Sequence, residues 1–263
     1  MAFALVLAPL LLALLALVVP SNRVRPWLVV AGAVTHAALT ALALRMPEVR
    51  ALGGWLALDE IGKLVLAVSS VLFLLCAAYA RGYLALHPKR PNRVFSACLL
   101  AFIAMVTLMF EAQHLGLMWV AMESTTLATA PLIYFNRTPR SLEATWKYLL
   151  IGSVGVALAL LGSLFLAYSA FSTGASPSLL QSDLVAEATK LSRPWLRSAF
   201  IILFIGYGTK MGLAPMHTWK PDAYGEAPGV VGAILAGGVT SCAFLALLRV
   251  YHICAAAGES AYT

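Results

Sequence analysis

Long apolar segments follow one another along almost the entire chain, and they restrict the possible folds more than any other feature of the sequence. A helix rises about 1.5 Å per residue, so about 20 consecutive apolar residues can cross the hydrocarbon core of a bilayer. Segments of about this length occupy residues 2–19, 27–44, 61–80, 94–110, 115–134, 148–171, 199–219 and 229–253. Only 11% of the residues are charged, against about 25% in soluble domains. The sequence therefore predicts an all-α integral membrane protein with about eight transmembrane helices.

The basic residues indicate how these helices are oriented. The connections after odd-numbered spans carry Arg23, Arg25, Arg81, Lys89, Arg90, Arg93, Arg137, Arg140 and Lys220. Those after even-numbered spans carry Arg45, Arg50, Lys190, Arg193 and Arg197. Short cytoplasmic loops are enriched in Lys and Arg, so we expect the first set to be cytoplasmic and the N-terminus to lie on the non-cytoplasmic side. Membrane orientation thus accounts for the net charge of +7, and we expect no nucleic acid as a partner.

Two residues of opposite charge lie deep within separate spans. Glu123 lies about 12 Å and Lys210 about 16 Å from the start of its helix. A charge at such depth is unfavourable by about 2.5–3.5 kcal/mol on insertion scales, and intramembrane charges usually serve a function. Thr126 shares a helix face with Glu123 and could orient water there. The pair suggests a path for protons or other ions; a static ion pair that joins two helices is the alternative.

The span that carries Lys210 contains several helix-breaking residues. Gly206, Gly208 and Gly212 are followed by Pro215, which lacks a backbone donor and clashes with the preceding turn of a helix. This pattern predicts a broken helix, a feature typical of ion and substrate sites within membranes. An ordinary proline kink is the alternative, and the GxxxG spacing of Gly208 and Gly212 could simply let a neighbouring helix approach.

Two further titratable residues flank these spans. Lys147 begins the sixth span, where it either extends to the interface or turns inward as a partner for Glu123. His217 follows the break, and a side chain that titrates near neutral pH suits a proton relay; an interfacial position beside Trp219 is the alternative. Asp222 is expected to be a solvated or capping residue.

The sequence contains no motif for a cofactor. It has no GxGxxG after a strand, no phosphate loop and no HExxH. Its four cysteines, which lack CxxC spacing, are expected to be small buried apolar residues. We therefore expect neither a cofactor nor a metal in this chain.

The residues around Glu123, Lys147 and Lys210 carry a family resemblance. They form the segments LMWVAMESTTLATAPL at 117–132, LEATWKYLLIGSVGVALALLG at 142–162, GYGTKMGLAPMHTWKPDA at 206–223 and EAPGVVGA at 226–233. These segments resemble the antiporter-like subunits of respiratory complex I, of hydrogenase-4-type membrane hydrogenases and of multisubunit sodium/proton antiporters. The resemblance implies that Glu123 and Lys210 form the central pair of a proton half-channel, with Lys147 as a further lysine beside them.

The resemblance also implies a domain organisation. Members of this family usually have about fourteen spans, including two inverted five-helix repeats, so the chain resembles only their N-terminal half. We expect a three-helix segment at 1–93, one five-helix proton-translocation repeat with a broken seventh helix at 94–255, and a polar tail at 256–263. Many members carry a histidine in the eighth span, where this chain has Ala236.

The function that follows is a non-catalytic membrane subunit of a redox-driven ion pump, of the NADH–quinone oxidoreductase or hydrogenase type, in a bacterial inner (plasma) membrane. Iron–sulfur, flavin, nickel–iron or quinone groups would then belong to partner subunits. The expected partners are the lipid bilayer, other membrane subunits and a peripheral redox arm. The alternatives are a component of a non-redox cation/proton antiporter or inorganic-carbon uptake complex, and a structural spacer without transport.

Overall fold

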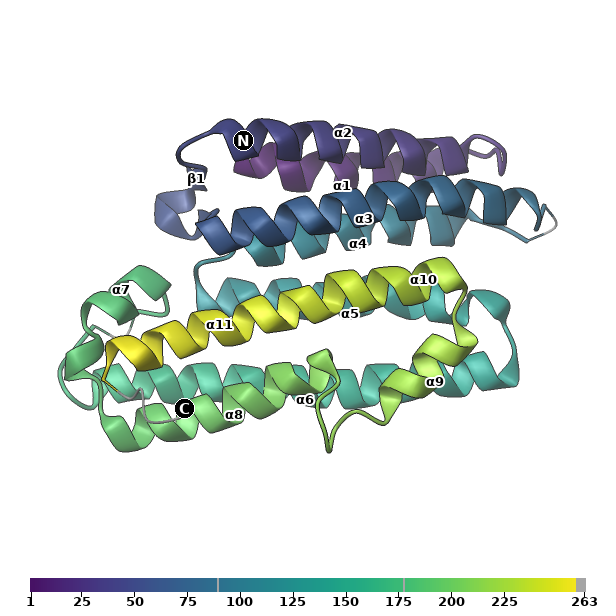
Figure 1. Ribbon diagram of the computed structural model, residues 1–263. Helices are drawn as coiled ribbons and strands as arrows, with labels where there is room; N and C mark the ends of the chain where they lie inside the picture. Colours follow the sequence, from purple (N-terminus) through teal and green to yellow (C-terminus); the bar gives the residue numbers. More distant parts are fainter. Residues whose placement is uncertain (89, 177, 259–263) are drawn as a thin grey trace.

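The computed structural model describes residues 1–88, 90–176 and 178–258, and this part of the chain is mainly helical (Figure 1). The long helices are α1 (Ala2–Val18), α2 (Arg25–Arg45), α3 (Glu60–Ala85), α4 (Arg93–Glu111), α5 (Leu115–Ile133), α6 (Pro139–Phe171), α8 (Arg193–Met211) and α11 (Thr240–Ala256). The short helices are α7 (Gln181–Ala186), α9 (Trp219–Glu226) and α10 (Gly229–Ile234), and the turns of other helix types are η1 (Leu52–Gly54), η2 (Tyr134–Asn136), η3 (Ala188–Lys190) and η4 (Leu235–Val239). The two-residue strands β1 (Arg50–Ala51) and β2 (Leu56–Ala57) form an antiparallel pair. Most of the predicted polar tail, 259–263, lies outside the described residues.

The prediction of an all-α membrane protein is confirmed. Among the described residues, five helices are long and apolar enough to cross a membrane: α2, α3, α4, α6 and the stretch Gly229–Ala256. Each of the eight predicted spans is largely helical, but the remaining three are shorter or less apolar than this standard, so eight membrane crossings stay a prediction.

The helices run side by side in two groups (Figure 1). In the first group, α1 packs against α2 and α4, and α2 packs against α3. In the second group, α6 packs against α5 and α8, and α8 packs against α11. The contact of α4 with α5 joins the two groups.

The connections between helices gather at two opposite ends of the bundle (Figure 1). We call one the basic end; it comprises the connections after α1, α3, α5 and α9. At this end, Arg90 of the connection after α3 donates a hydrogen bond of 2.8 Å to Asn136 Oδ1 of the connection after α5. We call the other the hairpin end; it comprises the connections after α2, α4 and α6 and contains β1 and β2. There, Gln113 N donates to Trp55 O over 2.8 Å. Successive long helices therefore alternate in direction, as hydropathy alone predicts.

Small residues bring α6 and α8 into backbone contact. A Cβ atom added to Gly206 would lie 2.6 Å from Ala159 N and 2.7 Å from Gly155 O, and one added to Gly162 would lie 3.0 Å from Leu203 N. Such close approach replaces the hydrophobic effect as a source of helix association within a bilayer. It fixes α8, and with it Lys210, against α6.

Gly208 and Gly212 do not serve the approach of α6 to α8. A Cβ at Gly208 would meet Leu213, and a Cβ at Gly212 would lie 2.6 Å from Lys220 Cδ. Gly212 instead ends α8, because its φ of 86° is a left-handed conformation that favours glycine. The predicted break is confirmed: α8 stops at Met211, and the chain resumes a helix only at α9.

The last predicted span is not one regular helix. Residues 235–239 form a π-helical turn between α10 and α11, which includes Ala236. Its Gly237 packs against Leu72 of α3 and its Gly238 against Phe102 of α4, since added Cβ atoms would lie 2.0 Å and 2.6 Å from those side chains. Two adjacent glycines thus let the widened turn fit closely between α3 and α4.

A buried arginine ties α11 to the first group of helices. Arg249 donates to Asp59 Oδ1 over 2.9 Å, and Asp59 in turn caps the N-terminus of α3 by accepting from Gly62 N. The guanidinium also donates to the carbonyls at the end of α4, those of Met109, Phe110 and Ala112. One side chain therefore satisfies carbonyl groups that the end of a helix leaves without partners.

Candidate functional site

The ammonium group of Lys210 is fully buried at the end of α8. Its Nζ donates to Thr126 Oγ1 of α5 and lies 5.1 Å from the centre of the Tyr148 ring of α6, an attractive cation–π geometry. The C-terminal end of a helix carries partial negative charge, which also favours a cation there. The cation is thus held by three helices at the point where α8 stops.

Gly152 of α6 provides the space for this ammonium group. A Cβ atom at this position would lie 2.6 Å from Lys210 Nζ and 3.4 Å from its Cε. Any side chain larger than hydrogen would displace the amine.

Glu123 lies on α5, one turn before Thr126. Its Oε1 accepts a hydrogen bond of 2.9 Å from Ser153 Oγ, while its buried Oε2 has no hydrogen-bond partner among the described residues. No direct ion pair joins it to Lys210 in this part of the chain, but its charge acts on Lys210 electrostatically. The two groups are near neighbours separated by the Thr126 region, and they are not a contact pair.

Hydroxyl groups extend this polar region along the interface of α5 and α6. Tyr148 Oη and Thr129 Oγ1 are 2.6 Å apart, and Thr129 also contacts the carbonyl oxygen of Thr125. A hydroxyl can donate and accept at once. The buried surface around Lys210 therefore contains groups that can pass a proton between them.

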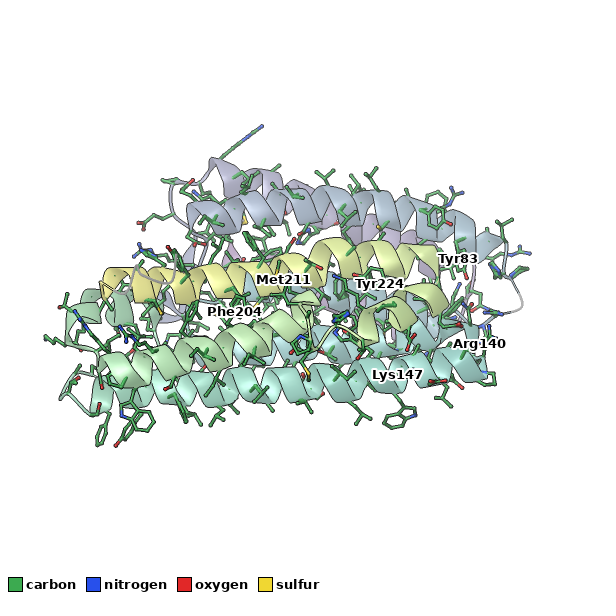
Figure 2. All side chains as sticks on the ribbon, turned by 60° about the horizontal axis from the view of Figure 1, so that its bottom comes forward. Tyr83, Arg140, Lys147, Phe204, Met211 and Tyr224 are labelled. Atoms are coloured by element: carbon green, nitrogen blue, oxygen red, sulfur yellow. The ribbon has the colours of Figure 1, made fainter. Side chains whose placement is uncertain are left out.

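Two side chains of α9 donate hydrogen bonds to backbone carbonyls at the end of α8, where the helix breaks. Trp219 Nε1 donates to Thr209 O and Lys220 Nζ donates to Met211 O, both over 2.9 Å. Figure 2 shows Met211 and Tyr224 on either side of the connecting segment 212–218. Non-helical backbone at membrane depth is tolerated only where its polar groups find such partners.

Lys147 lies toward the basic end of α6 (Figure 2). Its ammonium pairs with Glu143 Oε1 and with Asp222 Oδ2 of α9, each at 2.7 Å, and its side chain is 44% exposed. Among the described residues it forms no ion pair with Glu123, so the inward alternative is wrong in this structure. Asp222 lies in the first turn of α9 and its side chain is 42% exposed, as expected of a solvated residue, and it also connects α9 to α6.

Lys147 and Asp222 line a cavity of about 330 Å³ together with Arg140, Glu143, Gly225 and Glu226. The cavity opens where α6 and α9 meet, so water can reach this ion pair while Lys210 remains enclosed. The structure thus contains a partly exposed ion pair between α6 and α9 and, on α8, a buried lysine.

His217 is exposed in the connection between α8 and α9. Within the described part of the chain, no hydrogen bond or ion pair joins its ring to Glu123 or Lys210. The structure brings together Glu123, Thr126 and Lys210 and leaves His217 outside this group.

Three contributors escaped the sequence analysis: Tyr148, Gly152 and Ser153, all on α6. Positions 148, 152, 155 and 159 recur at a spacing of three or four residues, which defines one helix face. This spacing was the available signal for Tyr148 and Gly152, but it does not include Ser153. Among the described residues, no three His, Cys, Asp or Glu side chains come together as possible metal ligands.

A family model and individual relatives point to the same protein family. Residues 112–263 match the family described as NADH:quinone oxidoreductase/Mrp antiporter, transmembrane region. The chain is 33% identical to a hydrogenase-4 component F homolog of Methylacidiphilum infernorum, over 75% of this chain and 43% of that protein. It is 29% identical to NADH-quinone oxidoreductase subunit N of Anaeromyxobacter sp., over 99% of this chain and 52% of that protein.

The fold is similar to that of a chain of respiratory complex I from Thermus thermophilus. The TM-score is 0.77 with 27% identity, covering 95% of this chain and 53% of that one. The chain thus spans about half the length of these relatives. With more than half of its residues matched, the chain belongs to the NADH:quinone oxidoreductase/Mrp antiporter transmembrane family.

Proposed function

We propose that this chain is a membrane subunit of a redox-driven ion pump and that Glu123 and Lys210 form the centre of a proton half-channel. The observation that carries the proposal is the fully buried Lys210 ammonium, placed at the break of α8 and bonded to Thr126. An amine in this position can hold a proton inside the membrane. In this proposal the neighbouring Glu123 of α5 influences how firmly the amine holds that proton.

Protons enter from the basic end in this proposal. The cavity at Lys147 and Asp222 supplies the hydrated entrance, and the hydroxyl groups between α5 and α6 lead to Lys210. In a medium with a dielectric constant of about 20, unit charges about 6 Å apart interact by about 3 kcal/mol, which is about a 100-fold change in an equilibrium. Movement of one charge near Lys210 is therefore sufficient to load or release its proton.

Electron transfer belongs to partner subunits in this proposal. Relatives carry the names hydrogenase-4 component F homolog and NADH-quinone oxidoreductase subunit N, which supports assembly with other membrane subunits and a peripheral redox arm. Iron–sulfur, flavin, nickel–iron or quinone groups would be located there. The accumulation of arginines at the basic end supports a cytoplasmic position for that end, with the N-terminus on the opposite side of a bacterial inner membrane.

The test is Lys210→Met in the assembled complex, with proton movement and electron transfer measured in the same vesicles. The proposal predicts that proton movement falls while the lipid-embedded complex still assembles. Lys190→Met is the matched control, because Lys190 forms an exposed ion pair with Glu187 and its loss should change neither quantity. Undiminished proton movement per electron in Lys210→Met would defeat the proposal.

A cation/proton antiporter without redox chemistry is the second candidate, because the family description includes Mrp antiporters. An inorganic-carbon uptake complex would use the charge pair in a similar way. Co-purification separates these cases: iron–sulfur or quinone-reactive partners support the redox pump, whereas purely membrane partners or a zinc protein support the alternatives. A spacer role requires that Glu123→Gln and Lys210→Met together leave activity intact.

A further inference from the structure

A large cavity opens at the basic end between the start of α4 and the end of α5. Its volume is about 780 Å³, and three arginines, Arg90, Arg93 and Arg137, contribute to its lining. None of the described residues that line it is acidic. The cavity is separate from the one at Lys147, which carboxylates line.

The positive charges of this cavity are not compensated by carboxylates. In the described ranges, no ion pair involves these arginines; Arg90 donates to neutral acceptors, namely Asn136 Oδ1 at 2.8 Å and Phe135 O at 3.4 Å. Arg93 is also near enough to Arg25 for their charges to repel each other. A cluster of unpaired guanidinium groups in one hollow favours an anion, and phosphate accepts paired hydrogen bonds from arginine.

The cavity is built by defined contacts. Asn136, which holds Arg90, donates in turn to Glu226 O over 3.0 Å. Arg137 adopts a left-handed backbone with φ of 54°, which a residue other than glycine takes up only when its surroundings impose it. The Phe135 ring, 5.7 Å below the Arg90 guanidinium, packs on Phe95 with ring centres 4.5 Å apart.

Apolar side chains continue the cavity wall toward the membrane. Val94 is in the first turn of α4 and is 51% exposed, and Pro131 lies in the last turn of α5 beside the exposed Tyr134. Cations therefore lie at the helix ends, with apolar surface directly beside them on the spans. A phospholipid has the same order, with its phosphate at the interface and its acyl chains in the hydrocarbon core. A free phosphate ion would use only the arginines.

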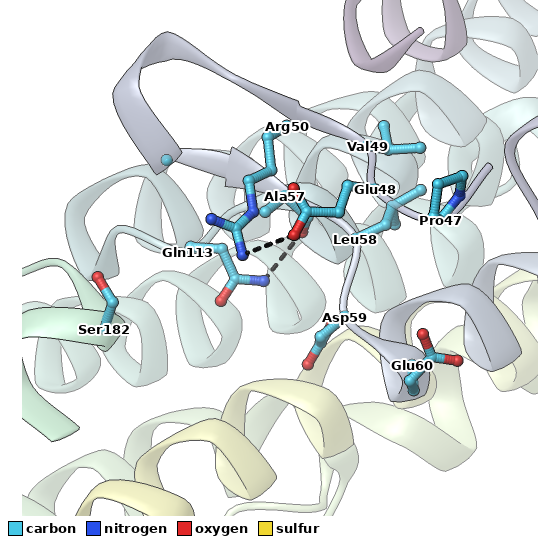
Figure 3. A pocket seen from close by; sticks show the side chains of 11 residues that line it. Pro47, Glu48, Val49, Arg50, Ala57, Leu58, Asp59, Glu60, Gln113 and Ser182 are labelled. Atoms are coloured by element: carbon cyan, nitrogen blue, oxygen red, sulfur yellow. Dashed lines mark hydrogen bonds and ion pairs between the residues drawn. The ribbon is translucent and has the colours of Figure 1, made fainter. Parts of the chain in front are cut away.

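We propose that this cavity binds the phosphate of an anionic phospholipid headgroup, with the acyl chains along Val94 and Pro131. The hairpin end provides a contrast (Figure 3). There, Arg50 lines a cavity of about 410 Å³ but is paired with Glu48 at 3.3 Å and accompanied by Asp59 and Glu60. An arginine in that setting does not attract an anion.

The experiment measures thermal unfolding of the assembled complex in nanodiscs of phosphatidylcholine with and without phosphatidylglycerol. Phosphatidylglycerol is expected to raise the midpoint of the wild type. Arg93→Gln with Arg137→Gln should remove this increase and weaken retention of phosphatidylglycerol, counted by native mass spectrometry, about fivefold for each arginine lost and about 25-fold for both. Arg50→Gln, which removes one positive charge at the opposite end, should retain the wild-type response.

Three outcomes would overturn the proposal. The first is an unchanged response to phosphatidylglycerol in the double variant. The second is an equal loss in Arg50→Gln, which would show a general effect of charge. The third is full stabilisation by inorganic phosphate in phosphatidylcholine nanodiscs, which would assign the cavity to a free anion and not to a lipid.

Discussion

The substitution Gly152→Ala tests whether Lys210 depends on the space beside α6. The added Cβ would lie 2.6 Å from Lys210 Nζ, whereas favourable contacts between heavy atoms lie at about 3.5–4.0 Å. The ammonium must therefore retreat by about 1 Å, and its hydrogen bond to Thr126 is lost. A hydrogen bond to a charged group contributes about 1.5–3 kcal/mol, and alanine restores about 1 kcal/mol of helix propensity. The net expectation is a destabilisation of about 0.5–2 kcal/mol.

The assay is thermal unfolding of the purified protein in nanodiscs, with Gly82→Ala as the matched control. Gly82 is an exposed glycine inside α3, and a Cβ added there meets nothing within 4 Å, so this control should be neutral or stabilising. In a Lys210→Ala background, Gly152→Ala should no longer destabilise the protein, because the amine that its Cβ would displace is absent. An equal cost of Gly152→Ala with and without the lysine would refute this reasoning.

The remaining predictions concern contacts that join helices elsewhere in the bundle and at the break after α8. Arg249→Lys should destabilise the protein by about 1.5–3 kcal/mol, because an ammonium cannot replace all the hydrogen bonds of a guanidinium that bonds to three carbonyls and a carboxylate; an unchanged unfolding midpoint would contradict this. Asp222→Asn should change stability by at most about 1 kcal/mol, since its pair with Lys147 is partly exposed, yet it should slow proton uptake at unchanged electron transfer; equal uptake would exclude the pair from the path. Trp219→Phe should cost about 1 kcal/mol by leaving the Thr209 carbonyl without its indole donor, and equal thermal stability of the two proteins would disprove this role.

The spans and the buried charges could be predicted from the sequence because each depends on a local property. An apolar run of sufficient length has few alternatives to a membrane helix. Lys210 was recognisable because a charge within such a run is rare, and the break after it because glycine and proline act on their own backbone. Hydropathy thus located the main elements of the site before any contact was known.

The contacts between helices could not be predicted in the same way. Asp222 reaches Lys147 only because α9 folds back against α6 after the break, and nothing local to Asp222 indicates this return. Similarly, several glycine pairs have the spacing for close approach, but the packing of α6 selects Gly206 and not the pair of Gly208 and Gly212. The π-helical turn at 235–239 depends on its fit against α3 and α4 and leaves no periodic signal.

The central claim is that Glu123 and Lys210 act on each other's protonation inside the membrane. It is tested most directly by the number of protons moved per electron transferred in proteoliposomes, for Glu123→Gln, for Lys210→Met and for both together. The account predicts that each single variant falls to the level of the double variant, because either loss disables the same step. Independent effects that add in the double variant, or pumping that none of the three variants changes, would contradict it.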